Sequence, residues 1–204
     1  ISLQIDASSG FKAGKATAYI KITNRGDERA DDVTPEIELG GKAAMGPTTN
    51  IAPGAEWSVA VQAGTPPVPA GTHTLAVRVR YADVLGYPYT AVASVPLVTA
   101  PPEDNAHAVS MSLQAPHDGV AVMTVRNLTG EKMSVLARLI LPDDLMSTNL
   151  VQQIMLPPDG QARIRFPLVN RWARPGSRYV VIGVADYTVG GLHGSATTKA
   201  MVQI

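Results

Sequence analysis

The chain has 204 residues, of which 45% are hydrophobic and 17% are charged. This composition is typical of compact globular proteins and excludes a disordered chain. Seventeen Lys and Arg balance seventeen Asp and Glu, so no net field would attract nucleic acid or an anionic membrane. The chain has no cysteine, which excludes disulfides and Cys-ligated metal centres. No apolar run reaches the roughly 18 residues of a membrane-spanning helix, so we expect no direct membrane insertion. From the balance of charge we expect no nucleic-acid partner.

Apolar residues alternate with polar ones at a period of two along most of the chain, which predicts β-strands. In the first half, strands are expected near residues 1–6, 15–24, 30–39, 47–52, 56–62, 73–82 and 88–98. Segments rich in Pro and Gly separate these runs and supply the turns. Seven short strands in about 100 residues are typical of an immunoglobulin-like sandwich.

The turn after the second expected strand, residues 24–32, contains Arg25-Gly26-Asp27, the tripeptide that integrins read in adhesive proteins. Three interpretations are an integrin-type loop, a calcium site and a solvated turn. The acidic side chains lack the EF-hand spacing, and Arg25 and Arg29 neutralise half of their charge. Chance alone yields the tripeptide roughly 0.05 times in such a chain. We therefore interpret the stretch as an exposed acidic turn, with Asn24 and Gly26 expected to adopt positive φ angles.

The second half of the chain repeats the first. Asn24 and Asn127 each end an alternating run and are 103 residues apart, and Gly71 and Gly176 are 105 residues apart. An offset that stays between 103 and about 105 residues indicates two copies of one module. The predicted fold is therefore all-β, with two tandem seven-stranded Greek-key sandwiches of the immunoglobulin type. The predicted boundaries are 1–99 for module 1, 100–107 for a linker stiffened by proline, and 108–204 for module 2.

Motifs for catalysis are missing from the sequence: there is no G-x-S-x-G, no G-x-G-x-x-G, no P-loop and no H-E-x-x-H. The nearest approach to a catalytic triad is His193-Gly-Ser195 with Asp186. Alternation of side chains along an ordinary hairpin argues against that arrangement. We predict no enzyme activity, and no catalytic, metal-binding or cofactor-binding residues.

Two predicted loops carry candidate contacts to a partner or ligand. Trp172 stands between Arg171 and Arg174, and interface hot spots favour aromatic side chains together with Arg. The alternative is that the indole caps the core while Arg174 stacks on it. Tyr87 and Tyr89 flank a proline at the start of the last strand of module 1, where the proline could equally protect an edge.

Several segments of module 1 resemble a known family, namely Ile22-Thr-Asn-Arg-Gly26, Ile51-Ala-Pro-Gly54 and Gly71-Thr-His-Thr-Leu-Ala-Val77. They look like the bacterial cell-adhesion-related (CARDB-like) immunoglobulin-fold modules. Residues 78–89 are similar to the closing hairpin of repeat domains in S-layer-like surface proteins. The resemblance implies a non-catalytic module of an exported prokaryotic protein, used as a spacer, an adhesion element or an assembly unit.

The leading functional hypothesis is therefore a structural or interaction module of the cell envelope. One alternative is a glycan-binding accessory module, and another is a subunit of an extracellular filament or pilus whose N-terminal strand, residues 1–6, pairs with a neighbour. Expected partners are a protein, a cell-envelope polysaccharide or further copies of the chain. The expected location is extracellular, on the cell surface or in the periplasm, with a signal peptide or anchor outside the given chain.

Overall fold

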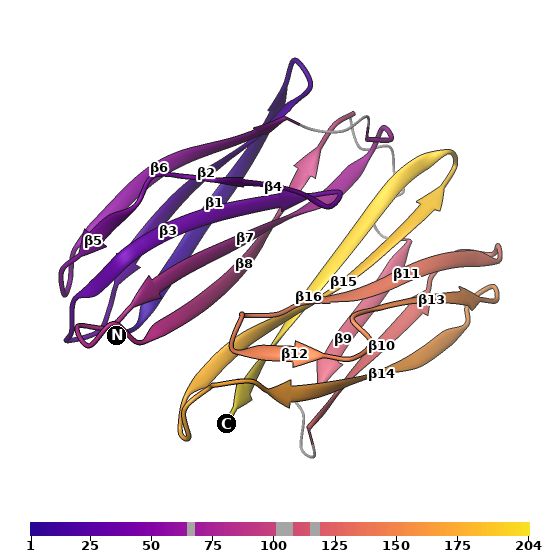
Figure 1. Ribbon diagram of the computed structural model, residues 1–204. Coiled ribbons are helices and arrows are strands. Elements are labelled where there is room, and N and C mark those ends of the chain that lie inside the picture. The colour runs from indigo at the N-terminus through magenta and orange to yellow at the C-terminus, as the bar shows by residue number, and fades with distance from the viewer. Residues whose placement is uncertain (65–67, 101–107, 115–118) are drawn as a thin grey trace. The chain divides into compact units, whose positions relative to one another are not determined.

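The computed structural model describes residues 1–64, 68–100, 108–114 and 119–204. These residues form antiparallel β-sheets, and no helix occurs within those ranges (Figure 1). The chain divides into unit 1, residues 1–68 and 75–97, and unit 2, residues 69–74 and 98–204. The predicted fold class is confirmed, because each unit is an immunoglobulin-like β-sandwich. Of the predicted linker at 100–107, residues 101–107 lie outside the described residues.

Unit 1 is built from two antiparallel sheets. Its strands are β1 (Leu3–Lys12), β2 (Lys15–Asn24), β3 (Ala30–Leu39), β4 (Lys42–Met45), β5 (Thr49–Ile51), β6 (Glu56–Gly64), β7 (Thr72–Ala82) and β8 (Pro88–Val98). The first three residues of β7 and the last residue of β8 belong to unit 2. One sheet has the order β1-β2-β6. The other has the order β4-β3-β7-β8, and β5 also pairs with β3.

Unit 2 follows the same plan. Its strands are β9 (Val109–Gln114), β10 (Val120–Asn127), β11 (Met133–Ile140), β12 (Leu145–Ser147), β13 (Val151–Leu156), β14 (Gln161–Asn170), β15 (Arg178–Val189) and β16 (Leu192–Gln203). The sheets have the orders β12-β14-β10-β9 and β13-β11-β15-β16. The two units differ in one short strand. In unit 1, β4 pairs with β3, whereas in unit 2 the corresponding short strand, β12, pairs with β14.

All seven strands predicted for the first half occur, and β4 is an addition. Its sequence, Lys42-Ala-Ala-Met45, has no β-branched or aromatic residue, so composition does not indicate a strand there. The strand forms because Gly40 and Gly41, with φ of 57° and 77°, make the tight turn that folds it back on β3.

Alternation sets the core of each sandwich. In β2, Ala16, Ala18, Ile20 and Ile22 are buried while the intervening side chains point away from the core. In unit 2, Met123 of β10 and Phe166 of β14 are fully buried in the same manner. Burying each large side chain of this kind contributes about 1.5–3 kcal/mol, so the period-two pattern is also the main source of stability.

A buried asparagine connects two loops at one end of unit 1. Asn24, the last residue of β2, is fully buried. Its Nδ2 donates to the carbonyl of Glu28 at 2.7 Å and to the carbonyl of Ile51 at 3.1 Å. Its Oδ1 accepts from the backbone N–H of Gly26 at 3.0 Å. The side chain therefore ties the bend between β2 and β3 to the end of β5.

Unit 2 repeats this arrangement at the equivalent position. Asn127 ends β10, is fully buried, and its Nδ2 donates to the carbonyls of Glu131 at 2.7 Å and Pro157 at 2.9 Å. Its Oδ1 accepts from the backbone N–H of Thr129 at 2.9 Å. We call Asn24 and Asn127 the anchor asparagines.

The expectation of positive φ at this turn is wrong. Neither Asn24 nor Gly26 lies in the left-handed region. Asparagine is needed for its amide, which can donate twice and accept at the same time. Glycine at position 26 is explained by crowding, because a Cβ there would lie 2.7 Å from the backbone nitrogen of Ser2 and 2.8 Å from the Cα of Ile1. Of the acidic side chains in residues 24–32, Asp27, Glu28 and Asp32 are exposed as predicted, whereas Asp31 is 17% exposed and pairs with Arg29.

We predict that Asn24→Asp lowers the free energy of unfolding of unit 1 by about 2–4 kcal/mol, and that Asn127→Asp does the same in unit 2. The substitution keeps the shape but removes both donors, leaving two buried carbonyls without their partner. Chemical denaturation followed by circular dichroism measures the effect. Asn149→Asp, at an exposed site, is the matched control and should change stability by less than about 0.5 kcal/mol. Equal stability of all three variants would contradict the anchor role.

Candidate functional site

The turn between β7 and β8 is held by one aspartate. Asp83 is buried, and its Oδ1 accepts from the backbone N–H groups of Leu85 and Tyr87, both at 2.9 Å. The N–H of Gly86 donates to the Asp83 carbonyl at 2.9 Å, and the N–H of Asp83 donates to the Tyr87 carbonyl at 3.1 Å. Four hydrogen bonds to one residue fix the shape of this turn.

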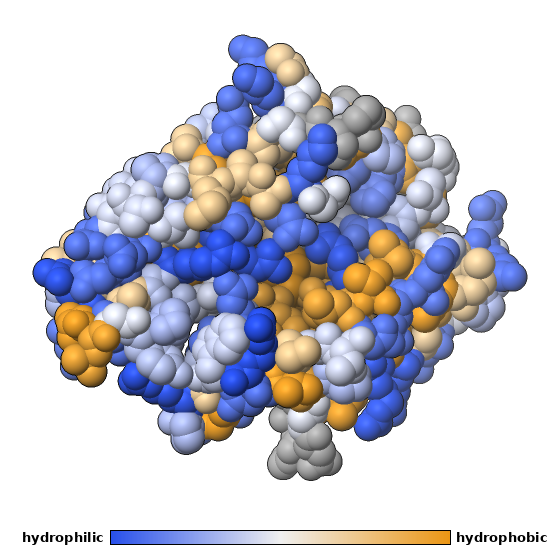
Figure 2. Space-filling model, viewed as in Figure 1, coloured by the Kyte–Doolittle hydropathy of each residue, from blue (hydrophilic) through white to orange (hydrophobic). Residues whose placement is uncertain are grey.

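This fixed turn presents apolar side chains to solvent. Leu85 is 85% exposed and Val84 is 57% exposed. Behind them, the rings of Tyr87 and Tyr89 lie 5.4 Å apart, and Tyr89 stacks on Tyr81 at 5.5 Å. We call Val84, Leu85 and Tyr87 the apolar tip. Figure 2 shows apolar surface at the end of unit 1 where Figure 1 places this turn.

The structure thus brings the predicted residues Tyr87 and Tyr89 together, and it adds Leu85, which sequence reasoning missed. An apolar residue beside a glycine turn gives no signal of its own, because a leucine in a hairpin is as often folded back onto the core. What exposes Leu85 is the hydrogen bonding of Asp83, which the sequence does not reveal.

The second predicted loop, between β14 and β15, has a different structure. The guanidinium of Arg171 lies 4.1 Å from the centre of the Trp172 ring, which makes Arg171 a cation-π partner of this indole. Trp172 is 41% exposed and Ala173 is the buried residue here, so the indole does not cap the core. Asn170 closes the loop by hydrogen bonds with the N–H of Ala173 at 2.7 Å and its carbonyl at 3.0 Å.

The triad-like residues of unit 2 do come together. Asp186 and Ser195 lie opposite each other in the β15–β16 pairing, and the Ser195 hydroxyl donates to Asp186 Oδ1 at 2.6 Å. His193 Nε2 lies 3.5 Å from the same oxygen. Arg138 Nε donates to Asp186 Oδ2 at 3.1 Å. Asp186 is therefore the centre of a polar cluster.

Residues 69–74, which belong to unit 2, add to this cluster. The rings of His73 and His193 stack with centres 4.2 Å apart and planes 9° apart. The hydroxyls of Thr74 and Ser195 share a hydrogen bond of 2.6 Å. The N–H of His193 also donates to the carbonyl of Ala70 at 2.8 Å.

The order of hydrogen bonds in this cluster does not suit nucleophilic catalysis. A serine nucleophile needs a base that accepts its proton, but Ser195 donates to the carboxylate and not to an imidazole. Among the described residues, no three His, Asp or Glu side chains are grouped to hold a metal ion. The described ranges also contain no helix that is long and apolar enough to cross a bilayer. The cluster is best explained as a structural network.

The environment shifts two pKa values in the cluster. Burial would raise the pKa of Asp186, but hydrogen bonds from His193 and Ser195, with the charge of Arg138, lower it overall. Burial lowers the pKa of His73, which is also close to His193. Both shifts favour a folded state in which Asp186 is charged and His73 is neutral.

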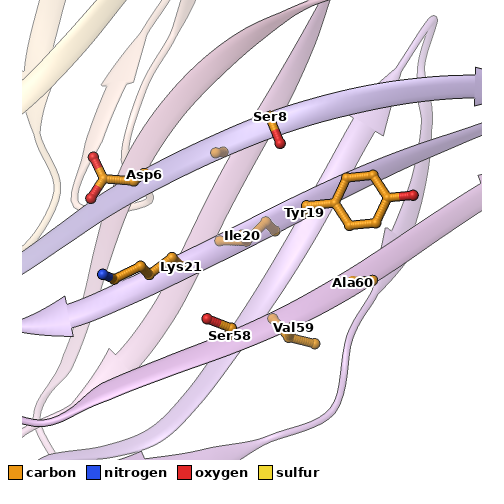
Figure 3. A pocket seen from close by; sticks show the side chains of 9 residues that line it. Asp6, Ser8, Tyr19, Ile20, Lys21, Ser58, Val59 and Ala60 are labelled. Atoms are coloured by element: carbon orange, nitrogen blue, oxygen red, sulfur yellow. The ribbon is translucent and has the colours of Figure 1, made fainter.

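The outward face of the β1-β2-β6 sheet has a shallow, open depression (Figure 3). Asp6, Lys21 and Ser58 form one cross-strand row along it, and Ser8, Tyr19 and Ala60 form the next. Tyr19 is exposed, and its ring lies over Gly10. Sequence reasoning did not select Tyr19, although its position between the buried Ala18 and Ile20 predicts an outward side chain.

Comparisons with known proteins add little about function. No protein-family model matches the chain, and no curated protein sequence matches it significantly. Similar solved structures include the periplasmic chaperone SfaE, with 15% identity, a TM-score of 0.40 and 100% of both chains covered. The E. coli chaperone DraB has 12% identity and a TM-score of 0.41, covering 100% of this chain and 98% of its own. The CupB2 chaperone of Pseudomonas aeruginosa has 14% identity and a TM-score of 0.39, covering 95% and 96%. At these values, the similarity carries no argument about activity or partners.

The lowered pKa of His73 predicts how stability depends on pH. The unfolded chain binds the proton first, at a pKa near 6.5, so stability is complete above that value and is lost as the pH falls below it. Asp186 acts in a lower window, because its contribution is lost only as the pH falls below about 3.8. We expect His73→Phe, which keeps a stacking ring but cannot titrate, to flatten the decline between pH 7 and 5. Unfolding titrations at both pH values test this, and an unchanged decline would contradict it.

Proposed function

We propose that the chain is a non-catalytic interaction module of an exported or cell-surface prokaryotic protein, and that it binds a protein partner through the apolar tip of unit 1. The observation that carries the proposal is the exposure of Leu85 on a turn that Asp83 holds rigid. Contiguous exposed apolar side chains are typical of sites where proteins contact their partners.

Rigidity matters for the affinity of such a contact. A partner that binds a flexible loop must compensate for the entropy of ordering it, about 0.5–1.5 kcal/mol for each immobilised side chain. The hydrogen bonds of Asp83 and the stacked rings of Tyr81 and Tyr89 order this turn in advance. Tyr87 adds the aromatic character that interface hot spots favour.

The two alternatives from the sequence gain less support. A sugar would stack on an open indole face, but the guanidinium of Arg171 lies over one face of Trp172. In a filament whose N-terminal strand pairs with a neighbour, β1 would have to use its outer edge, because it pairs with β2 from Leu3 to Lys12 in its own unit. The likeness to CARDB-like modules fits the proposal but remains a prediction.

The proposal is tested by binding with matched variants. The protein is immobilised, bound proteins from a cell-envelope extract of the source organism are identified, and the partner is then purified and titrated by calorimetry. We expect Val84→Ser with Leu85→Ser to weaken this purified complex by at least tenfold, because the variant loses the apolar area that the complex buries.

Met45→Ser is the control, since Met45 is 64% exposed on β4 of the same unit and should leave the affinity unchanged. Equal affinity of the tip variant and the control would contradict the proposal. So would multiple-turnover enzyme activity that disappears when a single titratable residue is replaced.

A further inference from the structure

Three arginines of unit 2 lie on the outward face of one sheet. In the pairing of β10 with β14, Thr124 is opposite Arg163, Val122 is opposite Arg165 and Arg126 is opposite Gln161. Opposite residues share a face, and the residues between them, such as Met123 and Ile164, fill the core. We call Arg126, Arg163 and Arg165 the basic face. All three are exposed.

The basic face lacks carboxylates. The other outward residues of β9, β10 and β14 are polar or apolar, and none of those that the structure describes is acidic: Ser110, Ser112, Gln114, Val120, Val122, Thr124, Gln161, Pro167 and Val169. Within the described ranges, none of the three arginine side chains forms an ion pair or a hydrogen bond. Their positive charge is therefore not neutralised by neighbours.

Arginines elsewhere in the molecule differ in this respect. Arg29 pairs with Asp31 at 2.6 Å, and Arg138 contacts Asp186 at 3.1 Å. On the β3–β7 face of unit 1, Arg78 pairs with Glu38 and Arg80 with Glu36, both at 2.7 Å. Arg78, Arg80 and Arg138 each reach a carboxylate on a neighbouring strand, whereas no such ion pair stabilises the basic face.

From these observations we infer that the basic face binds an acidic segment of a protein partner in an extended conformation. Arg163 and Arg165 are two residues apart on one strand, which places them about 7 Å apart. Alternate carboxylates of an extended peptide have the same spacing, and each guanidinium can hold a carboxylate through two parallel hydrogen bonds. Arg126, on the neighbouring strand, would widen the positive strip.

The shape of the face favours a peptide over a glycan. The outward positions of β9, β10 and β14 that the structure describes carry no aromatic ring on which a sugar could stack. They do carry Ser, Thr and Gln side chains, which can donate hydrogen bonds to peptide carbonyls and to carboxylates. This inference goes beyond the proposed function, because it concerns a charged contact of unit 2, whereas the apolar tip is a hydrophobic contact of unit 1.

The test uses the whole chain and a synthetic probe. A fluorescent ten-residue peptide of alternating Ser and Glu is titrated by anisotropy at about 20 mM salt, where screening is weak. A peptide of alternating Ser and Gln is the reference. We expect the Glu peptide to bind at least tenfold more tightly, and the preference to disappear near 500 mM salt.

Two variants locate the binding. Arg163→Gln with Arg165→Gln should weaken binding of the Glu peptide by about tenfold, and Arg126→Gln alone by about threefold, since each removes part of the positive strip. Lys12→Gln with Lys15→Gln removes the same net charge from the exposed β1–β2 hairpin of unit 1 and should leave the affinity unchanged. All these sites are exposed, so circular dichroism should show folded variants.

Four results would overturn the inference. One is no preference for the Glu peptide, and another is an equal loss in the lysine control, which would indicate a general charge effect. Binding of polygalacturonate but not of the peptide, with the same dependence on arginine, would assign the face to an acidic glycan. Self-association that disappears in the arginine variant, with no peptide binding, would assign it to a second copy of the chain. None of these results depends on the apolar tip.

Discussion

The fold of each unit depends on a side-chain amide that is cut off from water. An asparagine ends the second strand of each sandwich, and its three hydrogen bonds join loops that are far apart in sequence. Leaving a buried polar group unpaired costs about 1–3 kcal/mol, so the loops can move apart only at the cost of several such groups. The anchor asparagine thus holds the loops at one end of each sandwich in a fixed conformation.

The part of unit 1 that we propose to be functional lies at the same end as the loops that Asn24 joins. Asp31 lies opposite Ala82 in the pairing of β3 with β7, so the apolar tip projects from the same end as the bend held by Asn24. Asp83 also fixes a loop from inside the fold, because its side-chain oxygen accepts hydrogen bonds from two backbone N–H groups. Polar side chains inside the fold therefore determine which apolar side chains remain outside it.

The sequence predicted the features that arise from local pattern. Alternation located β2, β3 and β8 closely, and the repeat of Asn24 at Asn127 predicted two copies of one module. Prediction from the sequence failed where a feature depends on contacts between residues that are far apart in the chain. The role of Asn24 was assigned to backbone conformation because a hydrogen bond to Ile51 cannot be seen in a local motif.

The same limit applies to the candidate sites. Tyr87, Tyr89, Arg171 and Trp172 were selected because aromatic and arginine residues in loops are unusual in themselves. Leu85 was missed because its exposure depends on Asp83. The basic face cannot be seen in the sequence of one strand, because strand register brings Arg126 beside Arg163. Register between strands is a property of the folded sheet, and a single strand's sequence does not contain it.

Amide hydrogen exchange tests the central claim most directly, because it measures the stability of individual hydrogen bonds. The N–H groups of Gly26 and Thr129 lie in bends that carry exposed side chains, yet each donates to an anchor asparagine. The account predicts that both exchange only through the opening of the unit that contains them, as slowly as amides of β2 and β10. Exchange of Gly26 and Thr129 at the rate of an unprotected peptide, with the neighbouring strands still protected, would contradict it.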